Sequence, residues 1–167
     1  KINQASENAT ITLDKAYTES ITIPEGKTIT LDLNGQTLIN EEGKHTITNE
    51  GTLTIVGTGT VDNVSHGKGA VYNDAGATCT ILGGNYTRSQ ENGQSDSDSG
   101  GNSWYAIKNF GTMTIGEEGA PNDAVKVSFT GKYSSLVANG WQDGAAAGQP
   151  NKEPAYERDA QLTIHSG

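Results

Sequence analysis

The stretch GTLTIVGTGTVDN, Gly51–Asn63, is the most informative about the fold, because it alternates small polar residues with branched apolar ones and then recurs along the chain. Alternation with a period of two is the pattern of a β-strand that buries one face. Its core, in which threonine alternates with apolar residues after a glycine, is found with small changes at five places: Gly26–Leu31, Gly51–Ile55, Gly76–Ile81, Gly111–Ile115 and Gln161–Ile164. A strand repeated in this way predicts a solenoid, whose coils cover one another.

A second motif precedes four of these five strands. It consists of an apolar residue, a variable residue and asparagine, and its copies are Ile47–Asn49, Val71–Asn73, Ile107–Asn109 and Val137–Asn139. Successive asparagines are 24, 36 and 30 residues apart. Copies of a motif that are alike but unequally spaced indicate coils whose corners carry insertions. We expect each asparagine amide to bond to the backbone of the next coil and form a ladder, with glycine supplying the corner dihedrals.

Side chains alternate between the two faces of a strand, so the repeat predicts which residues lie inside. The apolar positions should form continuous interior columns, and Cys79 falls in one of them, in register with Leu53 and Met113. The threonines should point outward in a flat grid of about 7 Å by 4.8 Å. This grid contains Thr28, Thr30, Thr52, Thr54, Thr78, Thr80, Thr112 and Thr114.

The composition agrees with an all-β chain rich in turns, since only 32% of the 167 residues are apolar and 22 are glycine. We expect one domain, 1–167, that is a parallel β-helix (solenoid) of about five coils. Residues before Thr10 should cap it, and long corner loops should interrupt it at about 88–104 and 141–159. Tyr72 and Tyr86 are expected to decorate the coils.

The charge disfavours several partners. The net charge is −9, with only 11 lysines and arginines to face phosphates, so nucleic acid and anionic membranes are poor candidates. No apolar stretch is long enough to span a membrane, and the first residues lack signal-peptide character. The chain is interpreted as an excised segment of an extracellular protein, secreted or on the cell surface.

The segments TIPEGKTITLDLNGQTL (Thr22–Leu38) and NEGTLTIVGTGTVDN (Asn49–Asn63) resemble the right-handed parallel β-helix, pectin-lyase-like domains of secreted gut and rumen bacterial proteins. Within that group, the chain is similar to non-catalytic carbohydrate-binding modules, among them a xylan-binding family (family 89 in the module classification). The resemblance implies attachment to catalytic or surface domains in a larger glycan-degrading protein. It carries no site residues onto this sequence.

An enzyme is not expected. The two arginines, Arg88 and Arg158, lie in or beside insertion loops, and Asp32 and Asp62 are interpreted as solvated corner residues. The histidines are explained by solvent-exposed corners and lack metal-site spacing. No cofactor is expected; Asp96 and Asp98 begin like a calcium loop but lack its closing acid, so calcium stays a weak alternative to a flexible linker.

Aromatic residues at loop edges form the predicted binding site. Trp104, Tyr105, Trp141 and Tyr156 could stack on sugar rings, because aromatic rings offer flat apolar faces. Neighbouring polar groups could bond to sugar hydroxyls, namely Asn102, Gln142, Asp143 and Arg158. The alternative for each tryptophan is that it pins its own loop to the coil.

These features favour a non-catalytic module that binds a plant cell-wall polysaccharide, with xylan expected from the resemblance alone. Three other functions stay open: a surface adhesin that binds a host glycan or protein, a polysaccharide lyase or hydrolase, and ice binding through the threonine grid.

Overall fold

The structure is a computed structural model that describes residues 6–65, 67–90, 105–121, 123–128, 136–140 and 159–167. Within these residues the chain forms sixteen β-strands and no helix. All strand pairs are parallel, and they build three sheets. The expected all-β class is therefore confirmed, and the arrangement is consistent with a parallel β-helix.

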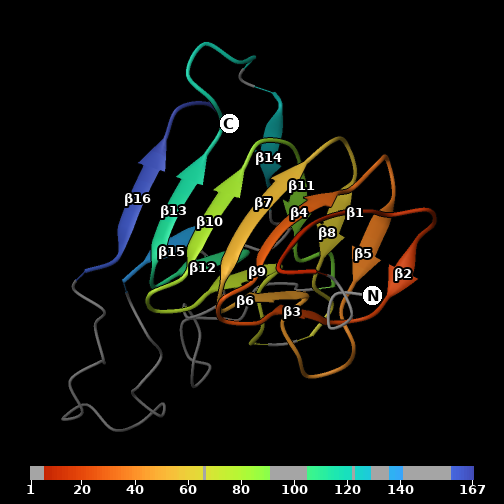
Figure 1. Ribbon diagram of the computed structural model, residues 1–167. Coiled ribbons are helices and arrows are strands. Elements are labelled where there is room, and N and C mark those ends of the chain that lie inside the picture. The colour runs from red at the N-terminus through yellow and green to blue at the C-terminus, as the bar shows by residue number, and fades with distance from the viewer. Residues whose placement is uncertain (1–5, 66, 91–104, 122, 129–135, 141–158) are drawn as a thin grey trace, which may run out of the picture.

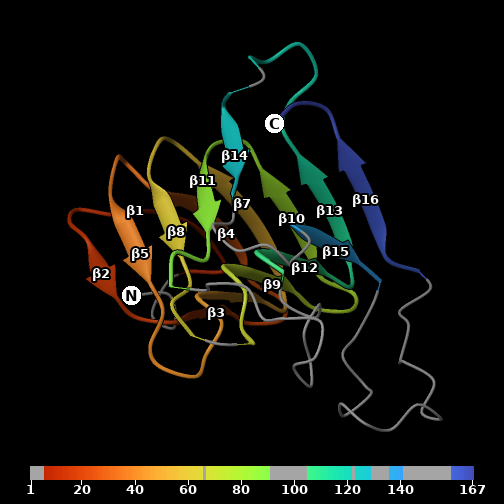
Figure 2. The same ribbon diagram turned by 180° about the vertical axis from the view of Figure 1, so that it is seen from behind.

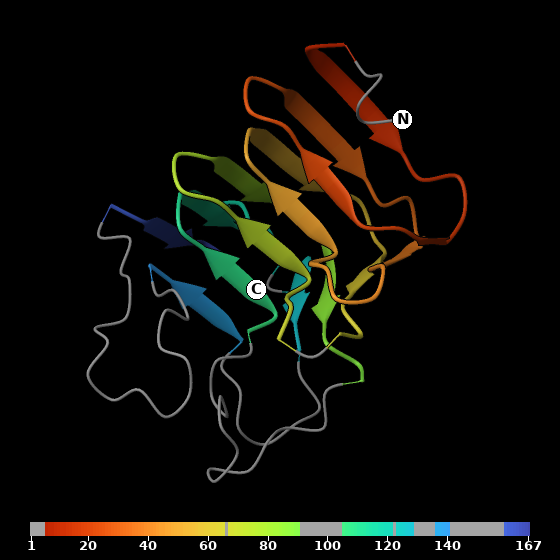
Figure 3. The same ribbon diagram turned by 90° about the horizontal axis from the view of Figure 1, so that it is seen from below.

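The three sheets are visited in turn along the chain, so neighbouring strands of a sheet are three strands apart in sequence. Sheet A, side by side in Figure 1, contains β1 (Asn8–Thr12), β4 (Thr28–Asp32), β7 (Thr52–Val56), β10 (Thr78–Ile81), β13 (Thr112–Ile115) and β16 (Gln161–Ile164). Sheet B, facing the viewer in Figure 2, contains β2 (Tyr17–Thr18), β5 (Thr37–Ile39), β8 (Thr60–Asp62), β11 (Gly84–Thr87) and β14 (Val125–Val127). Sheet C contains β3 (Ile21–Ile23), β6 (Ile47–Asn49), β9 (Val71–Asn73), β12 (Ile107–Asn109) and β15 (Val137–Asn139); Figure 3 shows it from below, from orange β3 to light-blue β15.

The interior consists of the predicted apolar columns. Along sheet A, one column runs Ala9, Ile29, Leu53, Cys79, Met113 and Leu162, and the other runs Ile11, Leu31, Ile55, Ile81, Ile115 and Ile164. Ile29, Leu53, Cys79 and Ile55 are completely buried. Because the burial of one such side chain stabilises the fold by roughly 1.5–3 kcal/mol, stacking one coil on another provides stability that a lone coil lacks.

The predicted asparagine ladder is confirmed, and it is tighter than expected, since the amides also bond to one another. The Nδ2 of Asn49 donates to the Oδ1 of Asn73 at 2.7 Å, Asn73 donates to Asn109 at 2.7 Å, and Asn109 donates to Asn139 at 2.6 Å. Asn73 and Asn109 also donate to the backbone carbonyls of Thr112 and Gln161. The ladder thus ties sheet C to sheet A at the corner between them.

Glycine serves two different purposes at these corners. Gly76 has a φ of 80°, in the left-handed region that other residues resist, as predicted. Gly111 is required for a different reason: an added Cβ would lie 2.6 Å from the carbonyl oxygen of Asp74 and closer still to that of Ala77. Close stacking of corners, rather than dihedral freedom alone, therefore selects glycine in this motif.

A cap was expected before Thr10, and the structure places Asn8 and Ala9 in β1, the first strand of sheet A, while residues 1–5 lie outside the described residues. Tyr86 is not a surface decoration. It is completely buried in register with Val61, and its hydroxyl donates to the carbonyl of Gly83 at 2.8 Å. The intervening Asn85 takes the outward position instead, because side chains alternate along β11.

Candidate functional site

Of the predicted sugar-binding residues, only Tyr105 lies within the described part of the chain, where it is half-exposed just before β12. The other seven lie outside the described residues: Asn102, Trp104, Trp141, Gln142, Asp143, Tyr156 and Arg158. The same is true of Asp96 and Asp98, the weak calcium candidates. The site must therefore be built from what surrounds Tyr105.

Three ring side chains lie in contact with one another along sheet C, two of them half-buried and one, Phe110, buried at 4% exposure. The rings of His45 and Tyr72 have centroids 4.7 Å apart with an interplanar angle of 28°, and those of Tyr72 and Phe110 are 5.3 Å apart at 49°. We call His45, Tyr72 and Phe110 the aromatic row. The row crosses three coils, because the three residues belong to or adjoin β6, β9 and β12, which are neighbours in sheet C.

The repeated motif explains why the row forms. In β9, Val71 and Asn73 are buried, so the alternation turns the middle residue, Tyr72, outward. Its register partner in β12 is Lys108, again the middle residue of the motif. The Lys108 Nζ lies 5.7 Å from the centroid of the Tyr105 ring, within the range of a cation–π contact. The predicted residue Tyr105 thus joins the same face as the aromatic row.

His45 acts as a neutral ring in this row. Burial, together with the positive charges of Lys68, Lys108 and Arg88, lowers its pKa to about 4. Its Nδ1 accepts a hydrogen bond of 2.9 Å from the backbone N–H of Gly69, which places the remaining proton on Nε2. The expected solvent-exposed corner is wrong for His45, although His165 is indeed exposed.

A hollow of about 360 Å³ adjoins the end of the aromatic row. Phe110 belongs to both features, and the other described residues that line the hollow are Gly76, Gly111, Thr112 and Asp159. Because Phe110 is only 4% exposed, the hollow offers a ligand rich in hydroxyl groups mainly the Thr112 hydroxyl and the Asp159 carboxylate for hydrogen bonding. The volume lies at the lower end of the range of small-ligand sites.

The outer face of sheet A carries the predicted threonine grid. One rank contains a threonine in every strand: Thr10, Thr30, Thr54, Thr80, Thr114 and Thr163. The second rank, Thr28, Thr52, Thr78 and Thr112, is exposed and is continued by Asn8 at one end and Gln161 at the other. The grid is a regular surface that differs in chemistry from the aromatic face of sheet C.

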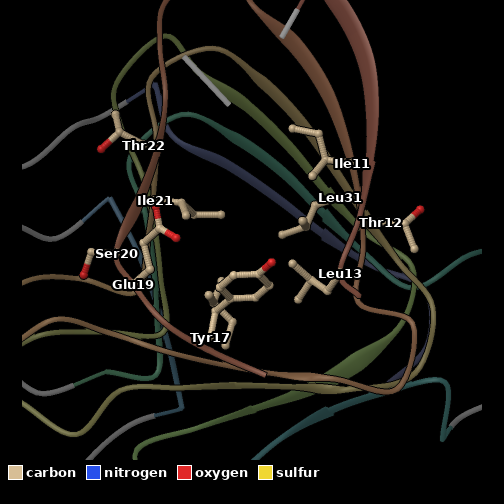
Figure 4. A pocket seen from close by; sticks show the side chains of 10 residues that line it. Ile11, Thr12, Leu13, Tyr17, Glu19, Ser20, Ile21, Thr22 and Leu31 are labelled. Atoms are coloured by element: carbon tan, nitrogen blue, oxygen red, sulfur yellow. The ribbon is translucent and has the colours of Figure 1, made fainter. Parts of the chain in front are cut away.

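A second hollow, of about 330 Å³, opens at the N-terminal end of the coil stack. Figure 4 shows the side chains of Ile11, Leu13, Tyr17 and Ile21 pointing toward it, and Leu31 of the next coil also lines it. Its lining continues the interior columns, so among the described residues this hollow lies at the N-terminal end of the core.

The carboxylates of Asp32 and Asp62 do not converge on one site. Asp32 ends a strand of sheet A, whereas Asp62 ends a strand of sheet B. Asp62 is buried rather than solvated, contrary to expectation, and accepts hydrogen bonds from the backbone N–H of Ser89 at 2.9 Å and from the Ser89 hydroxyl. Arg88 is completely buried just after β11. Among the residues that the structure describes, no group of three or more His, Cys, Asp or Glu side chains is arranged to hold a metal ion.

No protein-family model, no curated protein and no solved structure matches the chain. Within the described ranges, there is no helix of the length and apolarity needed to cross a membrane.

Proposed function

We propose that the chain is a non-catalytic carbohydrate-binding domain built on a right-handed parallel β-helix of about five coils. The observation that carries the proposal is the aromatic row, in which the half-buried rings of His45 and Tyr72 lie on the same face as Tyr105 and continue into the buried ring of Phe110. The Phe110 hollow adds a hydroxyl and a carboxylate at the end of this row. Such a surface provides the flat apolar contact and the polar rim that sugar rings require.

The proposed ligand is a plant cell-wall polysaccharide, and xylan is the first to test because of the resemblance noted above. The parent protein is proposed to be secreted or displayed on the cell surface, with this domain holding it against an insoluble glycan. Because the row rests on a stack of paired strands, binding should require little reorganisation. Trp104 and Trp141 remain proposed additional stacking residues.

The absence of catalysis is part of the proposal. Glycoside hydrolysis needs two carboxyl groups on opposite sides of one bond, and Asp32 and Asp62 belong to different sheets. The Asp62 carboxylate is moreover engaged by Ser89.

Affinity electrophoresis in gels that contain xylan, mixed-linkage glucan, pectin or mucin tests the proposal. The wild type should be retarded by one plant glycan, and Tyr72→Ala and Tyr105→Ala should each weaken the affinity roughly tenfold, the loss expected for one stacking ring. Tyr17→Ala is the matched control, because Tyr17 is also half-exposed but lies on sheet B at the N-terminal end of the stack. If none of the four glycans retards the wild type, the proposal fails and a protein-binding adhesin becomes the better hypothesis.

The threonine grid favours ice binding as a second candidate function. The observation that favours ice binding is the rank of six threonines in register, which repeats hydroxyl and methyl groups at the strand spacing of about 4.8 Å. Inhibition of ice recrystallisation by the wild type, lost in Thr80→Arg and kept in Tyr72→Ala, would support it. Equal inertness of all three proteins would exclude it.

A further inference from the structure

Three successive strands of sheet C, β6, β9 and β12, are preceded at the same position by His45, Gly69 and Tyr105. Each of these residues lies two before the first residue of its strand, and the three first residues are partners in register. The middle position is a glycine, and a Cβ added there would lie 2.9 Å from the carbonyl oxygen of Tyr105. The middle coil therefore presents its backbone, rather than a side chain, to the His45 ring.

This backbone fixes the tautomer of His45. The N–H of Gly69 donates to Nδ1 at 2.9 Å, and a ring nitrogen that accepts a hydrogen bond carries no proton. A backbone N–H can only donate, so the single proton of the neutral imidazole stays on Nε2. Burial, together with nearby positive charges, holds the pKa of this ring at about 4, so the ring is neutral at neutral pH.

The Nε2–H of His45 points to chemistry outside the chain. Within the described parts of the chain it has no hydrogen-bond partner, and the half-buried ring leaves this nitrogen in contact with solvent. The ring itself is held in place, since it stacks on Tyr72 at 4.7 Å with an interplanar angle of 28°. A ligand that lies against Tyr72 therefore meets a hydrogen-bond donor whose direction is already set.

We propose, on the basis of the carbohydrate-binding function proposed above, that His45 orients the glycan on the aromatic row by donating a hydrogen bond from Nε2 to an oxygen of the bound sugar. Stacking on a ring tolerates several orientations of a sugar, whereas one polar group at a fixed place selects among them. The group of the ligand that faces His45 has to accept a hydrogen bond, as a hydroxyl oxygen or a ring oxygen does. A sugar that carries hydrogen in place of this oxygen should bind more weakly, because the donor is left without a partner.

NMR of the imidazole nitrogens in isotope-labelled wild type, titrated with xylohexaose, tests this proposal. In the free protein, Nδ1 of His45 should be unprotonated, and the Nε2–H should exchange rapidly with water. Saturation with xylohexaose should shift the Nε2 signal and slow the exchange of its proton. His165 is the matched control, because it is exposed and follows β16 in sheet A, so its ring signals should stay unchanged.

Two variants separate binding by His45 from a structural role. His45→Gln and His45→Asn both remove the ring, but the glutamine amide N–H reaches the place of Nε2, whereas the asparagine oxygen reaches that of Nδ1 and can still accept from Gly69. His45→Gln should therefore bind xylohexaose roughly two- to tenfold more tightly than His45→Asn in calorimetry, the effect of one hydrogen bond. A purely structural role of His45 predicts the opposite order.

The outcomes distinguish this proposal from the function on which it rests. Equal affinities of the two folded variants, or tighter binding by His45→Asn, overturn the proposal. Ring signals of His45 that stay unchanged while the backbone amides of Tyr72 and Tyr105 shift also overturn it, and they leave the proposed function standing. If no amide responds to xylohexaose or to fragments of mixed-linkage glucan, pectin or mucin, the proposed function fails and the role of His45 fails with it.

Discussion

The asparagine ladder provides the most quantitative prediction. Asn73 is completely buried in the middle of it and holds the coils on both sides. Its Oδ1 accepts from Asn49 at 2.7 Å, and its Nδ2 donates to the Oδ1 of Asn109 at 2.7 Å and to the carbonyl of Thr112 at 3.2 Å. The substitution Asn73→Ala removes these bonds and a longer one of 3.4 Å to the carbonyl of Ala77, and it leaves the Asn109 Oδ1 without its donor in a site that is closed to bulk water.

The expected loss of stability depends on which hydrogen bonds each partner of Asn73 can still make. The Asn49 Nδ2 keeps the carbonyls of Thr78 and Gly51 as acceptors, so its loss is small. The loss of the donor to Asn109 and to Thr112 costs more, because a buried polar group without a partner costs about 1–3 kcal/mol. We expect Asn73→Ala to lower the free energy of unfolding by roughly 3–5 kcal/mol, a large share of a typical total of about 5–15 kcal/mol.

Asn139 is the matched control, because it belongs to the same ladder but is exposed at the C-terminal end. It accepts from Asn109 at 2.6 Å and donates to the carbonyl of Ala160 at 3.3 Å, and water can replace it in both bonds. Asn139→Ala should therefore cost only about 1 kcal/mol. Urea unfolding measures both values from the midpoint at an unchanged slope. Equal losses for the two variants, or no loss for Asn73→Ala, would show that the buried amide bonds do not stabilise the coil stack.

Three further predictions concern buried groups. The pKa of His45 is lowered to about 4 from an ordinary 6.5, so its contribution to stability is complete above pH 6.5 and is lost as the pH falls through about 4. The urea midpoint of His45→Gln should therefore fall less over this pH range than that of the wild type. An identical fall in the two proteins would contradict the lowered pKa. Burial raises the pKa of the Cys79 thiol to about 12 from 9.0, so the free energy of unfolding should decline as the pH rises from 9 toward 12. Iodoacetamide should modify Cys79 only in unfolded protein. Rapid labelling of the folded protein would show that the interior column of sheet A is open to solvent at Cys79. Gly111→Ala forces a Cβ against the Asp74 and Ala77 carbonyls, so thermal unfolding should shift to clearly lower temperature, and an unchanged midpoint would show that the corner can relax.

The interior of the fold could be predicted from the sequence because alternation and the repeat act within one strand. The positions of Leu53, Cys79 and Met113 follow from counting along each strand, and the registers confirm them. The asparagine ladder could be predicted for the same reason, since the motif recurs at the same point of each coil.

The surroundings of single residues could not be predicted, because they depend on contacts between coils. His45 is half-buried through Gly69, 24 residues away, and through the ring of Tyr72. Asp62 is engaged by Ser89, 27 residues further along. The irregular periods conceal such pairs until the register is known.

The aromatic row was also missed by sequence reasoning, although a signal for it existed. The middle residue of each asparagine motif points outward, so aligning the motifs would have placed Tyr72 beside Lys108 and Thr48 on one face. The residue after the last asparagine, Phe110, then extends the same face. The variable middle position of the asparagine motif, rather than its constant positions, identifies this surface.

The most direct test of the proposed function is an NMR titration of isotope-labelled protein with a xylan oligosaccharide, following each backbone amide. The account predicts that the largest shifts occur on the outer face of sheet C, at Tyr72, Tyr105 and Phe110, and that the threonine ranks of sheet A stay unchanged. An absence of shifts at saturating oligosaccharide, or shifts confined to sheet A, would contradict the assignment of xylan binding to the aromatic row.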